Sequence, residues 1–186
     1  HRQKYNGLTF AETFGDLAYT MYSHAISLRD LGCTQSPMNA WITLNGIETL
    51  PLRMERHCSN GLAVAKFLEK QANVEWVSHA GLESSPYFEL GKKYLPEGTG
   101  SVFTFGVKGG YESGLKMLES VELFSHVANI GDTRSLILHP ASTTHRQLTE
   151  EQRIAAGAGQ EVIRLSIGIE CVEDIISDLD QALNCL

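Results

Sequence analysis

The sequence predicts an α/β domain in which helices cover one face of a β-sheet, preceded by a long helix. Three observations lead to this prediction. Strand-like and helix-like patterns alternate from Val74 onward, one strand pattern carries an arginine among aliphatic residues, and the last residues form an amphipathic helix. The 186 residues, 42% of them hydrophobic, supply enough apolar material for one sizeable core.

The first predicted element is a helix over residues 14–31. Its apolar residues recur at helical spacing, and Gly32 follows as a stop signal. The residues of this stripe are Leu17, Met21, Ala25, Leu28 and Leu31.

A second, longer helix is predicted to begin at Ser36 and to continue to about Lys70. Ser36 can cap it, and Pro37 fits its first turn, where the missing N–H is not needed. Pro51 must kink or divide this helix, because its ring clashes with the carbonyl four residues earlier. We expect a helix of about 35 residues to be shared by two domains, with the boundary along it.

The remaining elements form the sheet and its helices. Strands are predicted at 74–79, 101–107 and 163–169, with short extended pieces at 124–129 and 136–138, and helices at 86–94 and 111–119. Thr149 and Gln152 form a capping box for a short helix that ends at Gly157. The last helix carries an apolar stripe from Val172 to Leu183.

The strand at 163–169 contains the most informative residue, Arg164. Alternation places Ile163 and Leu165 on one face and Arg164, Ser166 and Gly168 on the other. A guanidinium in such a strand needs an anion, which is either a protein carboxylate or the carboxylate of a ligand. Polar turns at 129–132 and 139–145 follow short apolar runs, and turns at strand ends are where ligand groups gather.

Charge and composition exclude several classes of partner. The net charge is −7 and the 15 basic residues are scattered, which argues against binding to nucleic acid or to an anionic membrane. No apolar run approaches the roughly 18 residues that span a bilayer, and no signal peptide is recognised, so we expect a cytoplasmic protein. The four cysteines lack C-x-x-C spacing and are expected to be small buried thiols; the alternative is a disulfide or zinc framework.

Several motifs follow one another along nearly the whole chain: S-P-M-N-A from Ser36, G-I-E-T-L-P-L-R from Gly46, A-N-I-G-D from Ala128, H-P-A from His139 and R-L-S-I-G-I-E from Arg164. In this order they resemble the C-terminal part of the Cys/Met-metabolism pyridoxal-phosphate enzymes. The resemblance implies a fold-type I transferase with a mostly antiparallel sheet in this region. It further implies that residues 1–55 are the tail of the pyridoxal-phosphate domain with a linker helix, and that residues 56–186 are the C-terminal α/β domain.

Two runs resemble the O-acetylhomoserine sulfhydrylase branch of this family more than its other branches. They are A-N-I-G-D from Ala128, where the C-S-lyase and cystathionine-synthase branches usually carry E-S-L-G-G, and F-T-F-G-V-K-G-G from Phe103. The resemblance implies an enzyme of methionine biosynthesis that converts O-acetylhomoserine and sulfide into homocysteine and acetate. The alternatives are a cystathionine γ-synthase-like or methionine γ-lyase-like member, or a non-catalytic carboxylate-binding module.

The resemblance also implies roles for individual residues. Arg164 matches the arginine that binds the α-carboxylate of the substrate, Asn129 lines the substrate site, and Thr144 orients the same pocket. Ala128 and Ile130 flank this wall and are expected to shape selectivity by size. For Asn129 and Thr144 the alternative is turn chemistry, in which each side chain satisfies nearby backbone groups.

The family binds pyridoxal 5'-phosphate through residues that lie N-terminal to the matched region. We therefore expect no imine lysine and no catalytic, cofactor-binding or metal-binding residue in this chain, which should be inactive alone. The imine lysine of this family is preceded by Ser and Thr. Lys4 is preceded by Arg2 and Gln3 instead, so it is interpreted as a surface charge. The expected partners are a small amino-acid substrate, the missing N-terminal domain, and further copies of the protein in a dimer or tetramer.

Overall fold

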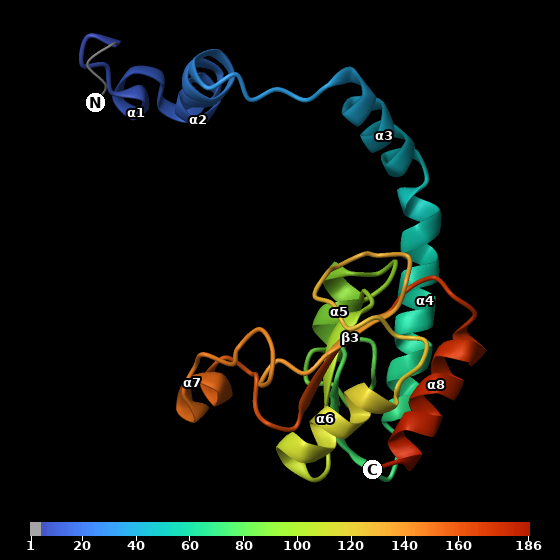
Figure 1. Cartoon of the computed structure of the whole chain (residues 1–186). Helices are drawn as coiled ribbons and strands as arrows, with labels where there is room; N and C mark the ends of the chain where they lie inside the picture. The colour runs from blue at the N-terminus through green and yellow to red at the C-terminus, as the bar shows by residue number, and fades with distance from the viewer. Residues whose placement is uncertain (1–4) are drawn as a thin grey trace. The chain divides into compact units, whose positions relative to one another are not determined.

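The computed structural model describes residues 5–186 (Figure 1). The chain divides into two compact units, of which the first ends at Glu48 and the second spans Thr49–Leu186.

The first unit is helical. It contains α1 (Phe10–Phe14), the 3₁₀ turn η2 (Gly15–Leu17), α2 (Ala18–Tyr22), the π-helical stretch η3 (Ser23–Asp30) and α3 (Pro37–Glu48). The helix predicted over residues 14–31 is therefore interrupted rather than continuous. Gly15 has a φ of 50°, which α-helical geometry does not accept, so α1 ends there. Gly32, with a φ of 73°, follows η3 as the predicted stop.

The long helix predicted from Ser36 to about Lys70 is divided at Thr49. Ser36 caps α3, since its Oγ accepts the Asn39 N–H at 3.2 Å. The second piece is α4 (Leu50–Leu68), with Pro51 in its first turn. Pro51 lacks an N–H and tolerates the first turn of a helix but not its interior, which explains why the helix restarts at this point.

The second unit contains a four-stranded antiparallel sheet. Its strands are β1 (Val74–Ser78), β2 (Val102–Val107), β3 (Leu136–Leu138) and β4 (Val162–Ser166), in the spatial order β1-β2-β4-β3. Each neighbouring pair is antiparallel, as expected. The extended piece predicted at 124–129 is not a strand, because Ser125 makes only an isolated bridge to Leu136.

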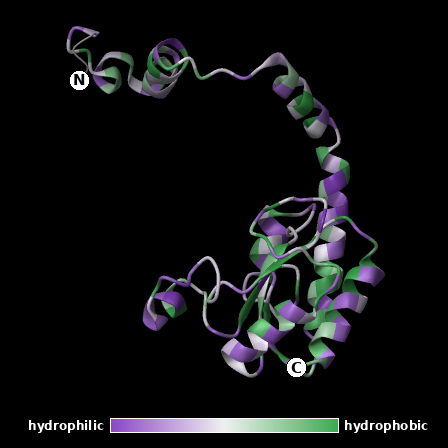
Figure 2. Ribbon diagram, in the orientation of Figure 1, coloured by the Kyte–Doolittle hydropathy of each residue, from purple (hydrophilic) through white to green (hydrophobic). Residues whose placement is uncertain are grey.

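Helices from four parts of the chain complete this unit, in addition to α4. They are α5 (Phe88–Tyr94), α6 (Gly110–Ser120), α7 (Glu150–Ala155) and α8 (Val172–Asn184). The apolar sides of α4, α6 and α8 share one core with the sheet residues Phe103, Phe105, Ile163 and Leu165. Figure 2 shows the hydrophobic residues concentrated on the strands and on the part of α4 beside α8.

The short helix α7 begins with the predicted capping box. The Thr149 N–H donates to Gln152 Oε1 at 3.0 Å, and the Gln152 N–H donates to Thr149 Oγ1 at 3.3 Å. Two otherwise unpaired backbone donors are thus satisfied at the start of the helix.

The expectation of buried cysteines is wrong. Cys33, Cys171 and Cys185 are exposed and Cys58 is half-buried, and all four are free thiols. Cys171 and Cys185 flank α8 at its two ends instead of belonging to its apolar stripe, which accounts for their exposure.

Asp178 on α8 holds the chain that leaves α6. Its side chain is only 8% exposed and accepts the N–H groups of Glu122 and Leu123, both at 2.9 Å. We expect Asp178→Ala to lower the free energy of unfolding by about 2–3 kcal/mol, because two backbone donors lose their acceptor. Chemical unfolding followed by circular dichroism measures this change.

Asp180→Ala is the matched control, since Asp180 is an exposed residue of the same helix whose carboxylate accepts a hydrogen bond from the Asn184 side chain at 3.3 Å. This variant should unfold within about 0.5 kcal/mol of the parent. Equal stability of the two variants would show that the carboxylate of Asp178 does not hold this segment.

Two buried histidines make the stability depend on pH. Burial lowers the pKa of His79 and of His139, because it penalises the charged imidazolium; hydrogen bonds to the Gly100 and Gln160 carbonyls oppose this in part. His79 Nδ1 accepts the Gly81 N–H at 3.0 Å, so a proton on this nitrogen would face another donor.

In the unfolded chain these histidines titrate near a pKa of about 6.5, and in the folded chain they titrate lower. As pH falls below about 6.5 the unfolded state binds more protons than the folded state, so the free energy of unfolding should decrease until the folded pKa is passed. Unfolding curves at pH 7.5 and 5.5 measure the decrease. His79→Gln should reduce it, whereas a variant of the exposed His24 should not.

Candidate functional site

Arg164 lies on the face of the sheet that α4, α6 and α8 do not cover. In β4 its neighbours Ile163 and Leu165 are fully buried in the core, so alternation turns the arginine to the opposite face. Thr104 of β2 and Leu138 of β3 are its direct partners across the sheet and therefore share this face. The antiparallel register thus fixes where the guanidinium emerges.

The charge of Arg164 has no protein counter-ion within residues 5–186. The guanidinium makes a long hydrogen bond of 3.4 Å, in which Nη2 donates to the backbone oxygen of Asn129. The ion pairs of the described residues join Lys92 to Glu89 and Arg134 to Asp132 instead. The alternative of a structural ion pair is therefore not realised in this part of the chain, and most of the five guanidinium donors are free for a ligand.

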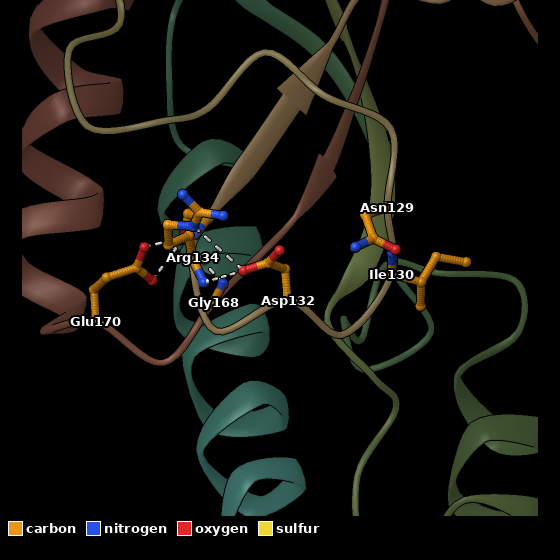
Figure 3. Close-up of polar contacts among 7 residues, drawn as sticks. Asn129, Ile130, Asp132, Arg134, Gly168 and Glu170 are labelled. Atoms are coloured by element: carbon orange, nitrogen blue, oxygen red, sulfur yellow. Dashed lines mark hydrogen bonds and ion pairs between the residues drawn. The ribbon is translucent and has the colours of Figure 1, made fainter. Parts of the chain in front are cut away.

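Asn129 belongs to an irregular loop that is closed at its base by β3. The Ser125 N–H donates to the Ser135 oxygen at 3.0 Å, and the Ile137 N–H donates to the Ser125 oxygen at 3.1 Å. The Asn129 side chain is exposed and accepts the N–H of Ile130 at 2.9 Å (Figure 3). Turn chemistry thus describes the side chain here, while the backbone of Asn129 makes the contact with Arg164.

Thr144 lies in a turn that follows β3. It is exposed, and its Oγ1 forms a hydrogen bond of 2.8 Å with His145 Nδ1. Thr144 and Ala128 line the same hollow of about 490 Å³, together with Val127, Leu138 and Thr143. The structure therefore brings the turn and the loop to one cavity, whereas no contact joins Thr144 to Arg164 directly.

His139 holds this turn from within the core. It is fully buried, its Nε2 lies 2.8 Å from the Gln160 oxygen, and its Nδ1 lies 3.0 Å from Ser142 Oγ. Thr143 Oγ1 also donates to the His139 carbonyl at 2.8 Å. These contacts give His139 a structural role in the turn.

Sequence reasoning assigned no role to three polar residues that surround the site. Glu170 accepts two hydrogen bonds from Ser135, and Asn60 of α4 donates to the chain that follows β4. Asn60 is 2% exposed and Ser135 fully buried. A polar residue at a core position of a helix pattern is the one sequence signal that could have indicated Asn60.

Pyridoxal phosphate forms an imine with a lysine side chain. The lysines within residues 5–186 are all exposed; they are Lys66, Lys70, Lys92, Lys93, Lys108 and Lys116. Lys4 lies outside the described residues.

A group of three or more metal-ligating side chains is absent from the described part of the chain. Within residues 5–186, no helix combines the length and hydrophobicity needed to cross a bilayer.

Comparison with known proteins identifies relatives along nearly the whole chain. The chain is 48% identical over 179 residues to a homocysteine synthase of Schizosaccharomyces pombe, and 47% identical over 188 residues to an O-acetyl-L-homoserine sulfhydrylase of Leptospira meyeri. Each match covers 96% of this chain but 42% of the relative. The chain thus spans about two-fifths of the length of these relatives.

A solved structure gives the same relationship for the fold. A putative O-acetylhomoserine (thiol)-lyase of Campylobacter jejuni is 39% identical, superposes with a TM-score of 0.86, and matches 98% of this chain and 43% of its own. That structure contains N'-pyridoxyl-lysine-5'-monophosphate. The family model for Cys/Met metabolism PLP-dependent enzymes matches residues 1–184. The chain therefore belongs to the Cys/Met metabolism PLP-dependent enzyme family.

Proposed function

We propose that the protein containing this chain is a pyridoxal-phosphate-dependent sulfhydrylase that converts O-acetylhomoserine and sulfide into homocysteine and acetate. In this proposal the chain supplies the anchor for the substrate carboxylate and not the lysine that binds the cofactor. The observation that carries it is Arg164, a guanidinium on the open face of the sheet with no carboxylate partner in the described residues. The names of its relatives support the choice of substrate.

The residues of this chain would bind and orient the substrate. The planar fork of Arg164 matches a carboxylate in a bidentate pair, which fixes both the position and the plane of the group. Asn129 and Thr144 would border the substrate from the loop and from the turn, and Ala128 and Thr144 line one hollow beside it. Pyridoxal phosphate, bound by the rest of the protein, would supply the electron sink for the reaction.

The apolar surface of α3 supports a partner for this chain. Four large apolar side chains of this helix are each more than half exposed: Trp41, Ile42, Leu44 and Ile47. Exposed apolar groups of this density are normally covered by protein. We propose that the N-terminal pyridoxal-phosphate domain and further copies of the protein cover them, with residues 1–55 joining that domain to residues 56–186. The cytoplasmic location stays a prediction.

Arg164→Ala tests the carboxylate anchor in the complete enzyme. We expect kcat/KM for O-acetylhomoserine to fall by about 100-fold or more, mainly through KM, because the substrate loses a charged pair and its orientation. Arg164→Lys should recover only part of the loss, since an ammonium lacks the fork. Steady-state kinetics with sulfide in excess measures both variants.

Arg146→Ala is the matched control, because it removes an exposed arginine from the neighbouring turn. It should leave kcat/KM within about twofold of the parent enzyme. Near-parent kinetics of Arg164→Ala would contradict the assignment of the anchor.

The choice of the second substrate is tested by competition between nucleophiles. With O-acetylhomoserine, sulfide should yield homocysteine at least about tenfold faster than cysteine yields cystathionine. Chromatographic quantification of the two products decides between them. Faster formation of cystathionine would instead favour the cystathionine γ-synthase branch, and release of a thiol from methionine would favour the lyase branch.

A further inference from the structure

We infer that Glu170 is a positioning residue that holds the Asn129 loop against the strand of Arg164. We call Glu170, Ser135 and Gly168 the carboxylate clamp. This inference rests on the proposed function, because it concerns the same substrate site. Figure 3 shows Glu170 and Gly168 at one end of the loop and Asn129 with Ile130 at the other.

The clamp joins two segments that lie far apart in the sequence. Glu170 Oε1 accepts the N–H of Ser135 at 2.6 Å, and Glu170 Oε2 accepts the hydroxyl of Ser135 at 2.9 Å. Ser135 Oγ in turn accepts the N–H of Gly168 at 2.9 Å. Ser135 is fully buried and Glu170 half-buried, so these charge-assisted bonds are largely shielded from water.

The two segments approach so closely that position 168 has no room for a side chain. A Cβ on Gly168 would collide with Glu170 Oε2 and the Thr133 oxygen, and would lie 2.6 Å from the Arg134 carbonyl carbon. The Ile169 N–H also donates to the Thr133 oxygen at 2.9 Å. Glycine at position 168 therefore permits the close approach of the two segments, and Glu170 joins them through its hydrogen bonds to Ser135.

Helix α4 fixes the strand side of the clamp. Asn60 Nδ2 donates to the backbone oxygen of Gly168 at 3.1 Å and to the backbone oxygen of Glu170 at 2.9 Å. His57 Nδ1 lies 2.7 Å from the Ile167 oxygen. Because α4 packs in the core, the segment that carries Glu170 is rigidly placed and the loop is the part that Glu170 restrains.

Both ends of the site depend on this restraint. Arg164 precedes Gly168 on the strand side, and Asn129 precedes Ser135 on the loop side. Their direct contact is a single hydrogen bond of 3.4 Å, which is too long to hold the loop by itself. The clamp supplies the stronger connection, so it should set the distance between the loop and the guanidinium.

Glu170→Gln in the complete holoenzyme tests the clamp. The amide keeps the shape, but it removes the charge and one acceptor: with its oxygen on the Ser135 N–H, its NH₂ group cannot accept the Ser135 hydroxyl proton. L-norvaline and butylamine, which differ only in the α-carboxylate, are titrated against the absorbance of the bound cofactor. The dissociation constant of L-norvaline should rise about tenfold, and that of butylamine should change less than about twofold.

Glu173→Gln is the matched control, since it removes the same charge from an exposed residue whose carboxylate contacts the Cys171 thiol. It should leave both constants unchanged. Ser135→Ala should weaken the binding of L-norvaline. The loss of binding free energy in the double variant with Glu170→Gln should be smaller than the sum of the two single losses, because both changes break one network.

Hydrogen exchange supplies a second measurement that does not depend on ligand binding. The amides of Ser135 and Gly168 should exchange faster in Glu170→Gln than in the parent, while amides of α6 should not. Unchanged protection, or equal weakening of L-norvaline and butylamine, would overturn the positioning role.

The parent enzyme and Arg164→Ala separate this inference from the proposed function. A parent enzyme that binds L-norvaline no better than butylamine would contradict the carboxylate site itself. If the parent prefers L-norvaline and Arg164→Ala loses that preference while Glu170→Gln keeps it, the anchor stands and the clamp alone is wrong.

Discussion

The site depends on one constraint, the two-residue alternation of β4 with one face sealed in the core. Ile163 and Leu165 are buried against α4, α6 and α8, which leaves Arg164 no direction except the open face. A register shift by one residue would bury the guanidinium and expose the aliphatic side chains, at a cost that excludes it. Because β2 and β3 pair with β4 on both sides, this register is held along the whole strand.

Carboxylates that accept backbone N–H groups organise the irregular chain between α6 and β3. The Asp178 carboxylate accepts the N–H groups of Glu122 and Leu123 at the start of this segment, and the Glu170 carboxylate accepts the N–H of Ser135 at its end. Between them Asp132 accepts the Arg134 N–H at 3.0 Å, a bond that lowers the pKa of Asp132. The segment thus lacks regular secondary structure, but it is bound to α8 at its start and to the chain after β4 at its end, with a local turn bond between them.

Two features of the described residues leave a charged group and large apolar side chains without protein cover. The arginine face of the sheet holds a charged group without a counter-ion in residues 5–186, and α3 exposes large apolar residues. Both features are unfavourable for an isolated molecule and favourable for a surface that another domain covers. The relatives, of which this chain matches about two-fifths, are long enough to contain such a domain.

The sequence alone determined the features that depend on near neighbours: the buried and open faces of β4, the capping box at Thr149, the break enforced by Pro51, and the stripe of α8. Side-chain periodicity and terminal hydrogen bonds are local, so they can be read from spacing. Only the tertiary structure decided that Arg164 has no acidic partner among residues 5–186, that the backbone of Asn129 contacts it, that the cysteines are not buried, and that Glu170 accepts hydrogen bonds from Ser135. Those contacts join residues tens of positions apart, and no periodicity within one element records which distant segments will meet.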